Sequence, residues 1–260
     1  MPVATEEFLH VTEIAGEEIS REQFERLCHR YYWAGEYCRG RDVLEAACGS
    51  GPGLRYLAQR ARSLKAGDYS PEVLARAEAE CKGTCELRVF DAQEMPYGDA
   101  SFDVVLLFEA LYYVPQAERF VREAARVLRP GGVLLIATAN KDLYDFNPSP
   151  HSFTYYGAVE LSKLTRDAGF DPSLFGYLRA DQVSFRQRVL RPVKAAAVTL
   201  NLMPATMSGK KLLKRLVFGA PVTMPGSVVE GMIEYAPPHG IPSDEPDRIH
   251  KVIYCAARKR

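Results

Sequence analysis

The sequence predicts a doubly wound α/β fold with a mostly parallel sheet, on the strength of three observations. Short apolar segments alternate with helical patterns from residue 42 onwards, as in a parallel sheet with crossover helices. Residues 102–108 (FDVVLLF) form a continuous apolar run, typical of a central strand buried on both faces. A glycine-rich turn (CGSGPG, 48–53) follows the first strand and precedes a helix. Such a turn is where an open α/β sheet places a ligand.

The elements can be assigned in order along the chain. A helix is expected at 20–37, because Ser20 is a suitable N-cap and apolar residues recur at helical spacing. Further helices are expected at 53–61, 71–81, 117–128 and 159–168, and strands at 42–47, 63–69, 85–90, 102–108, 133–137 and 250–257. Pro71 suits a first helical turn, and Gly169 ends the last helix. No internal repeat interrupts this order.

Composition and charge exclude several classes of protein. The 260 residues are 47% hydrophobic and 25% charged, as in an ordinary globular protein with a large core. Thirty-three basic and thirty-three acidic residues cancel, so no nucleic-acid partner is expected. The first ten residues, MPVATEEFLH, lack the basic and apolar regions of a signal peptide. No apolar run approaches the roughly 20 residues of a membrane span. We expect a cytoplasmic protein.

The six cysteines contain no C-x-x-C pair and indicate no metal site. Cys81 and Cys85 bracket Lys-Gly-Thr, a spacing that is wrong for a tight zinc knuckle. Cys48 and Cys255 lie in apolar runs and are expected to be buried free thiols. A reducing compartment is the simplest setting for them.

The glycine turn is the sharpest motif. Glycines allow positive φ angles and let a ligand approach the backbone, although a tight turn without a ligand stays an alternative. The dinucleotide fingerprint requires a third glycine at position 54, where this chain has Leu54. No Lys-Ser/Thr pair follows the turn, so a phosphate cradle is disfavoured. Glu45, just ahead of the turn, suits a ligand that carries a cationic amine and a sulfonium.

Two acids end the next two strands. Asp68 lies 17 residues after Gly51, close to the spacing expected for a carboxylate that binds ribose hydroxyls. Asp91 ends the third strand, where it could reach an adenine amino group. A single acid at a strand end is commonly a helix cap. Two such acids on consecutive strands, beside a glycine turn, favour a nucleoside ligand.

With these motifs the chain resembles the class I S-adenosylmethionine-dependent methyltransferases, in the methyltransferase-domain group. LEAACGSGPG resembles the first motif of that family, GDYSPEVLARA the second, FDAQEMPYGDASFDVVLLFEALYYV the third and fourth, and ARVLRPGGVLLIATAN the fifth. The resemblance spans residues 41–170, about half of the chain. One departure is Ala47, where the family usually has glycine.

The resemblance, together with the acids above, implies S-adenosylmethionine as cofactor and S-adenosylhomocysteine as product. The expected cofactor-binding residues are Tyr31, Glu45, Ala47, Gly49, Ser50, Gly51, Asp68, Tyr69, Asp91, Ala92 and Phe108. Of these, Ala47 and the glycines are expected along the methionine portion, and Phe108 beside the sulfonium. Tyr31 and Tyr32 are candidates for the carboxylate end of the cofactor, and core packing of both tyrosines is an equal alternative.

The resemblance also implies a seven-stranded sheet in which the final strand is antiparallel. The chain then divides into an N-terminal helical lid (1–38), a cofactor-binding core (39–179), an insertion that covers the acceptor (180–248) and a final core strand (249–260).

The acceptor side has weaker signals. Methyl transfer depends mainly on alignment, so a dedicated base is optional. The expected catalytic residues are Glu109 and His151, since a histidine can deprotonate a hydroxyl or amine near neutral pH. A structural hydrogen bond for Glu109 and a loop or helix-capping role for His151 are the alternatives. The expected acceptor-binding residues, which follow strands four and five, are Tyr112, Tyr113, Asn140, Tyr155 and Tyr156.

A basic segment precedes the last strand. Residues 179–219 contain nine basic residues and one acidic residue, Asp181. Three interpretations stay open: a lid over an anionic or partly apolar acceptor, peripheral contact with an anionic membrane surface, and an ordinary solvated face. The lid is favoured, because insertions near strand ends vary the substrate choice in such folds.

The function expected from the sequence is therefore methyl transfer from S-adenosylmethionine to an oxygen or nitrogen of a small molecule. Two alternatives are kept: a non-catalytic or membrane-surface-associated cofactor-binding protein, and an NAD-dependent oxidoreductase. The acceptor and the oligomeric state are not specified by the sequence.

Overall fold

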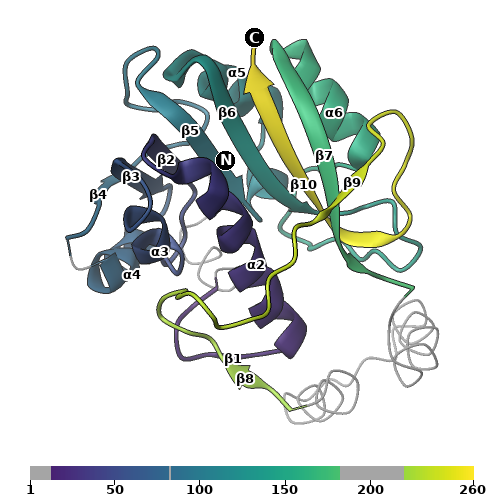
Figure 1. Cartoon of the computed structure of the whole chain (residues 1–260), viewed down its shortest axis with the longest axis horizontal. Helices are drawn as coiled ribbons and strands as arrows, with labels where there is room; N and C mark the ends of the chain where they lie inside the picture. The colour runs from purple at the N-terminus through teal and green to yellow at the C-terminus, as the bar shows by residue number, and fades with distance from the viewer. Residues whose placement is uncertain (1–12, 82, 182–219) are drawn as a thin grey trace.

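The computed structural model describes residues 13–81, 83–181 and 220–260. Its centre is an eight-stranded sheet of order β4-β3-β2-β5-β6-β10-β7-β9 (Figure 1). The strands are β2 (Asp42–Ala46), β3 (Ser63–Asp68), β4 (Glu86–Val89), β5 (Phe102–Phe108), β6 (Leu128–Ala139), β7 (Phe170–Arg179), β9 (His239–Ile241) and β10 (His250–Lys259). A separate two-stranded sheet joins β1 (Glu18–Ile19) and β8 (Val222–Thr223).

The helices alternate with the strands as expected. They are α2 (Arg21–Cys38), α3 (Leu54–Ala58), α4 (Pro71–Cys81), α5 (Ala117–Val127) and α6 (Ala158–Asp167), with a 3-10 turn at Leu111–Tyr113. Ser20 caps α2 as predicted: its Oγ accepts from the Gln23 amide, and the Gln23 side chain accepts from the Ser20 amide. This reciprocal pair satisfies two donors that the first helical turn would otherwise leave unpaired.

The strand directions confirm the doubly wound α/β fold. Strands β2 to β6 pair in parallel, and β10 pairs antiparallel with both β6 and β7, between which it lies (Figure 1). Two details differ from the expectation. The short strand β9 adds an eighth strand at the edge beyond β7. Strand β6 begins at Leu128, so the Arg-Pro-Gly-Gly segment that ends α5 already belongs to the strand.

Alternating side chains of the strands enter two cores, one on each face of the sheet. Val43, Leu106 and Leu135 pack with α2, α3 and α4, and the intervening residues Leu44 and Leu107 pack with α5 and α6. This alternation is the expected consequence of the two-residue period of a strand. Burial on both faces explains the near-continuous apolar runs in the sequence.

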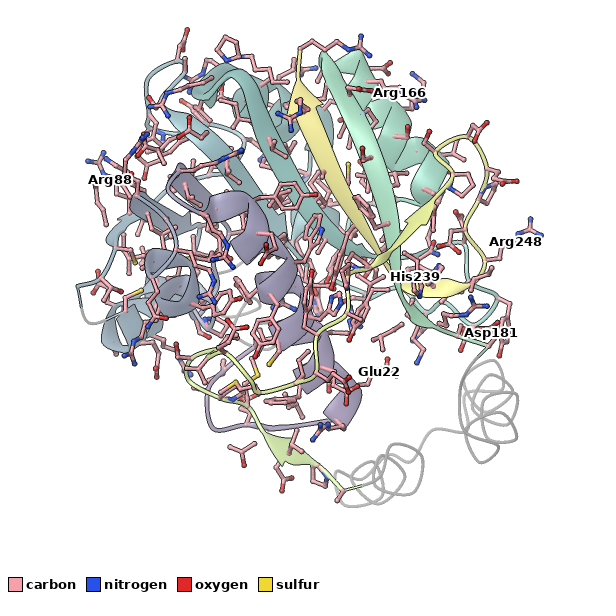
Figure 2. The ribbon with its side chains drawn as sticks, viewed as in Figure 1. Glu22, Arg88, Arg166, Asp181, His239 and Arg248 are labelled. Carbon is pink, nitrogen blue, oxygen red and sulfur yellow. The ribbon has the colours of Figure 1, made fainter. Side chains whose placement is uncertain are left out.

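Helix α2 is fixed to the C-terminal part of the chain. Glu22, labelled in Figure 2, lies in the first turn of α2 and accepts from Lys251 at the start of β10. Tyr32 donates to the carbonyl of Val229 (2.5 Å) and accepts from the amide of Met232 (2.9 Å). The residues from 224 to 236 therefore lie along α2 and hold it against the sheet.

A further bond on the other face joins the edge of the sheet to a helix. Arg166, labelled at the end of α6 in Figure 2, donates to Ser243 Oγ (2.8 Å). Ser243 lies in the segment between β9 and β10.

Most of the basic segment lies outside the described residues, so its three interpretations stay predictions, as does the division into lid, core and insertion. Among the described helices, none has the length and apolar character that a membrane crossing requires.

Candidate active site

A cavity of about 420 Å³ opens where the carboxyl ends of β2, β3 and β5 meet helix α2. Ligands of open α/β sheets bind at this edge. The cavity is lined by many of the residues that the sequence singles out: Tyr31, Ala47, Gly49, Ser50, Asp68, Tyr69, Asp91, Ala92, Phe108, Glu109, Tyr112 and Tyr113. The fold thus brings the expected cofactor residues and part of the expected acceptor side into one space.

The turn after β2 is left-handed at three of its positions. Gly49 and Gly51 have φ angles of 59° and 76°, and Ala47 has a φ of 53°. An alanine in this region is strained, whereas a glycine would adopt the same backbone angles without strain. At Gly53 a Cβ would overlap the ring of Tyr31 (1.9 Å from Cε1). The last glycine therefore makes room for α2 rather than for a ligand.

Asp68 at the end of β3 holds the glycine turn. One carboxylate oxygen accepts from the Gly49 amide (2.9 Å) and the other from the Ser70 amide (3.0 Å). Burial raises the pKa of Asp68, and the backbone hydrogen bonds oppose this rise. The carboxylate is thus positioned at the cavity wall with acceptor capacity left on both oxygens.

Asp91 and Tyr69 lie at the wall beside it. Asp91 accepts from the Gln93 amide (2.8 Å) and from Gln93 Nε2 (3.1 Å), which fixes the turn after β4. The Tyr69 side chain is 46% exposed at the cavity.

Tyr31 and Glu45 form a buried pair beneath the turn. The Tyr31 hydroxyl donates to Glu45 Oε1 (2.7 Å), and Glu45 Oε2 has no hydrogen-bond partner among the described residues. Burial raises the pKa of Glu45 to about 7, against the hydrogen bond from Tyr31 and the charge of Arg30. Glu45 does not itself line the cavity, whereas its hydrogen-bond partner Tyr31 does.

Two arginines of α2 line the cavity, and sequence reasoning missed both. Arg30 is only 5% exposed and pairs with Glu13, and its Nε has no partner among the described residues. Arg26 donates to Glu109 at 2.6 Å. Their four-residue spacing puts both arginines on one face of the helix, but spacing alone does not show whether that face is buried or solvated.

Glu109 lies between the arginines of α2 and the aromatic part of the cavity, and it contacts both. Its φ of 51° places it in the left-handed region at the end of β5. Besides Arg26 it accepts from the Tyr112 hydroxyl (3.1 Å). Burial raises the pKa of Glu109, but the charges of Arg26 and Arg30 outweigh this and hold it below its ordinary value. Glu109 is therefore ionised at neutral pH.

Aromatic rings form the wall beyond Glu109. Tyr112 packs edge-on against Tyr113 (centroids 4.6 Å apart) and stacks on Tyr155 (4.6 Å). Tyr113 and the half-exposed Phe153 also line the cavity, whereas Tyr155 lies behind Tyr112 as its support. Phe153 is a further wall residue, besides the two arginines, that the sequence reasoning did not name.

The remaining candidates lie outside the cavity wall. The Asn140 side chain is buried and donates to the carbonyls of Asp247 (2.6 Å) and His250 (2.8 Å), so it fixes the entry to β10. Tyr156 packs against the core on the α5 and α6 face. His151 is exposed, and its backbone amide donates to Ser149 Oγ (3.4 Å). Gly51 contacts α4 instead: a Cβ there would lie 3.0 Å from Ala77 Cβ.

Comparisons with known proteins assign the class. A relative from Mycolicibacterium smegmatis, named as a probable S-adenosylmethionine-dependent methyltransferase, is 37% identical over 152 residues, covering 57% of this chain and 56% of the relative. The chain therefore spans about half the length of the curated relatives it matches. It carries a Rossmann-like domain of the S-adenosylmethionine-dependent methyltransferase class, and S-adenosylmethionine is the cofactor of that class.

A family match covers part of this core. Residues 44–136 match the family described as the methyltransferase domain. The match runs from within β2 to within β6 and includes the glycine turn, Asp68, Asp91 and Glu109.

Solved structures show the same fold. The YcgJ protein of Bacillus subtilis has a TM-score of 0.58 at 17% identity, covering 89% of this chain and 98% of that chain. The [4+2]-cyclase SpnF has a TM-score of 0.57 at 18% identity, covering 96% and 88%. Because a [4+2]-cyclase shares the fold, the fold alone does not define the reaction.

Proposed function

We propose that this chain transfers the methyl group of S-adenosylmethionine to an oxygen or nitrogen of a small-molecule acceptor. The observation that carries the proposal is a single cavity with two chemically different parts. One part consists of the glycine turn, Asp68 and Asp91; the other consists of Tyr112, Tyr113 and Phe153. Donor and acceptor could thus lie in one space, as an in-line displacement requires.

The residues at the first part fit the cofactor. Left-handed glycines leave the backbone open to close approach. Asp68 offers carboxylate oxygens to ribose hydroxyls, and Asp91 lies one strand further, where an adenine would follow. The unpartnered Nε of the buried Arg30 offers a donor to the cofactor carboxylate.

When bound, S-adenosylmethionine supplies a methyl group on a sulfonium, which is already a good electrophile. The work left to this chain is alignment of the acceptor, exclusion of water and removal of a proton. Tyr112, Tyr113 and Phe153 form an apolar wall that excludes water, and Glu109 is the ionised acceptor of hydrogen bonds closest to that wall. We assign to Glu109 the role of orienting the hydroxyl or amine that is methylated.

The acceptor class follows from the same lining. Arg26 is paired with Glu109, and Arg30 is assigned above to the cofactor carboxylate, so neither cation is left for an anionic acceptor. The aromatic wall favours a neutral or partly apolar acceptor with one hydroxyl or amine. His151 lies outside the cavity, so we do not assign it the role of the base.

The proposal is tested by methyl transfer from isotope-labelled S-adenosylmethionine to a panel of phenols, aliphatic alcohols and primary amines. Acceptor-dependent formation of S-adenosylhomocysteine is expected, with the label on oxygen or nitrogen. Glu109→Gln should lower kcat at least tenfold, and His151→Ala should leave it within about twofold. A product labelled on carbon, or equal losses in both variants, would contradict the proposal.

A further inference from the structure

The turn between α4 and β4 brings two thiols together. Cys81 ends the helix and Cys85 directly precedes the strand, and their sulfur atoms are 3.0 Å apart. The turn is closed by Thr84, whose amide (3.0 Å) and hydroxyl (2.7 Å) both donate to the Cys81 carbonyl. This closure holds the two sulfur atoms face to face.

The two thiols differ in exposure. Cys81 is 1% exposed, whereas Cys85 is partly exposed. The other four cysteines, Cys28, Cys38, Cys48 and Cys255, are all buried. Cys85 is therefore the thiol that an oxidant from solution reaches first, and Cys81 is the partner held behind it.

The dithiol does not belong to a metal site in the described residues. No group of three or more histidine, cysteine or acidic side chains there is arranged to hold a metal ion. A pair of thiols in contact, without further ligands, instead favours redox chemistry.

We propose that Cys81 and Cys85 form a redox-modification site, at which a peroxide converts the two thiols to an intrachain disulfide. In the first step the Cys85 thiolate attacks a peroxide oxygen. The S–O bond forms, the O–O bond of hydrogen peroxide breaks, and the expelled hydroxide takes up the proton that the Cys85 thiol released and leaves as water, so that Cys85 becomes a sulfenic acid. In the second step the Cys81 sulfur attacks the Cys85 sulfur. The S–S bond forms, the S–O bond breaks, and a second water leaves with the Cys81 proton.

Electrostatics assign the same roles to the two cysteines. The hydrogen bond from Cys81 lowers the pKa of Cys85, whereas that bond and burial raise the pKa of Cys81. Burial raises the pKa of the other four thiols as well. Because the thiolate is the reactive form, Cys85 should react before any other cysteine of the described chain.

The test is hydrogen peroxide titration of the reduced full chain, followed by blocking of free thiols under denaturing conditions and peptide mass mapping. We expect a peptide that contains both Cys81 and Cys85 and has lost two hydrogens, formed at least ~10-fold faster than oxidation at any other cysteine. Dithiothreitol should reverse it. Uniform oxidation of all six thiols, or oxidation of Cys85 to a sulfinic acid with Cys81 still reduced, would overturn the proposal.

Single variants separate the two roles. Cys81→Ser should stop the reaction at the Cys85 sulfenic acid, which dimedone traps, and Cys85→Ser should leave Cys81 reduced. Cys255→Ala is the matched control, since it removes a buried thiol on the opposite face of the sheet and should form the disulfide at the wild-type rate. Trapping of a sulfenic acid at Cys81 instead would reverse the assignment and overturn it.

Discussion

Individual residues at the cavity carry conformations and charge states that an ordinary core residue would avoid. Ala47 and Glu109 end neighbouring strands with left-handed backbones, and Glu45, beneath the cavity, is a buried carboxyl. Strained or enclosed groups of this kind persist where the surrounding structure holds them, and they concentrate at functional sites. Each of them makes a measurable prediction.

Ala47→Gly should stabilise the protein. The left-handed conformation costs a non-glycine residue about 1–2 kcal/mol, and the substitution removes this cost. Glycine also has greater freedom in the unfolded chain, which cancels about 0.5–1 kcal/mol of the stabilisation. The free energy of unfolding, measured in urea, should rise by about 0.5–1 kcal/mol. Ala46→Gly, in β2 where the backbone is extended, is the control and should lower it. Equal losses in both variants would show that Ala47 is not strained.

Glu45 should make stability depend on pH. Its pKa is about 7 in the folded protein against an ordinary 4.5, so folding favours the protonated form. The free energy of unfolding that protonated Glu45 contributes is fully present below about pH 4.5 and is lost as the pH rises through about 7. The difference between the two limits is about 3 kcal/mol. Glu45→Gln keeps an acceptor for Tyr31 and should remove this part of the slope. The exposed Glu36→Gln is the control, and an unchanged slope in Glu45→Gln would contradict the account.

At the scale of the elements, the strands and helices were largely predictable, and the contacts between distant segments were not. All eleven predicted elements occur, and ten of them lie within a few residues of their expected bounds, because alternation and capping are local signals. The exception is β6, which begins at Leu128 instead of residue 133. The seventh core strand, β7, was not placed, and β9 was not expected. Neither strand has a strong pattern of its own: β7 alternates irregularly, and β9 has three residues.

The residues of the candidate site likewise include some that the sequence predicts and some that it does not. The glycine turn, Asp68 and Asp91 follow strand ends and could be identified, because parallel strands bring their carboxyl ends together. Arg26 and Arg30 could not be distinguished by sequence from solvated helix residues, since their burial depends on how α2 packs on the sheet. Asn140 also follows a strand end, but tertiary contacts direct its side chain to β10.

The glycine turn and α4 act as a packed unit, which Gly51→Ala tests. A Cβ at Gly51 would lie 2.7 Å from Leu54 Cδ1 and 3.0 Å from Ala77 Cβ, at a φ of 76°. We expect a loss of about 2–4 kcal/mol in unfolding free energy, from strain and crowding together. Gly40→Ala is the matched control: its φ is 66° with nothing within 4 Å, so it should lose only about 1–2 kcal/mol. Equal losses would exclude the crowding.

The segment before α2 places a carboxylate against the cavity. The Glu13 carbonyl accepts from Ser50 Oγ (2.5 Å), and its carboxylate pairs with Arg30. If the cofactor carboxylate uses Arg30, it competes with Glu13. Glu13→Gln should then tighten S-adenosylhomocysteine binding about fivefold, the equivalent of about 1 kcal/mol for a partly exposed pair. The exposed Glu18→Gln is the control, and weaker binding in Glu13→Gln would contradict the competition.

At the scale of the whole molecule, the last strand and the first helix close the fold around the site. Strand β10 lies between β6 and β7, and α2 covers the cavity while Lys251 and Glu22 join the two. A ligand that binds only this closed arrangement must stabilise the whole molecule. The unfolding free energy should therefore rise by about 2.7 kcal/mol when S-adenosylhomocysteine is present at 100 times its Kd.

The most direct test of the central claim is calorimetric titration of the full chain with S-adenosylhomocysteine and, separately, with NADH. We predict saturable binding of one S-adenosylhomocysteine per chain, no binding of NADH, and loss of binding in Asp68→Ala. The exposed Asp99→Ala should bind like the wild type. Binding of NADH without S-adenosylhomocysteine, or unchanged affinity in Asp68→Ala, would contradict the assignment of this cavity.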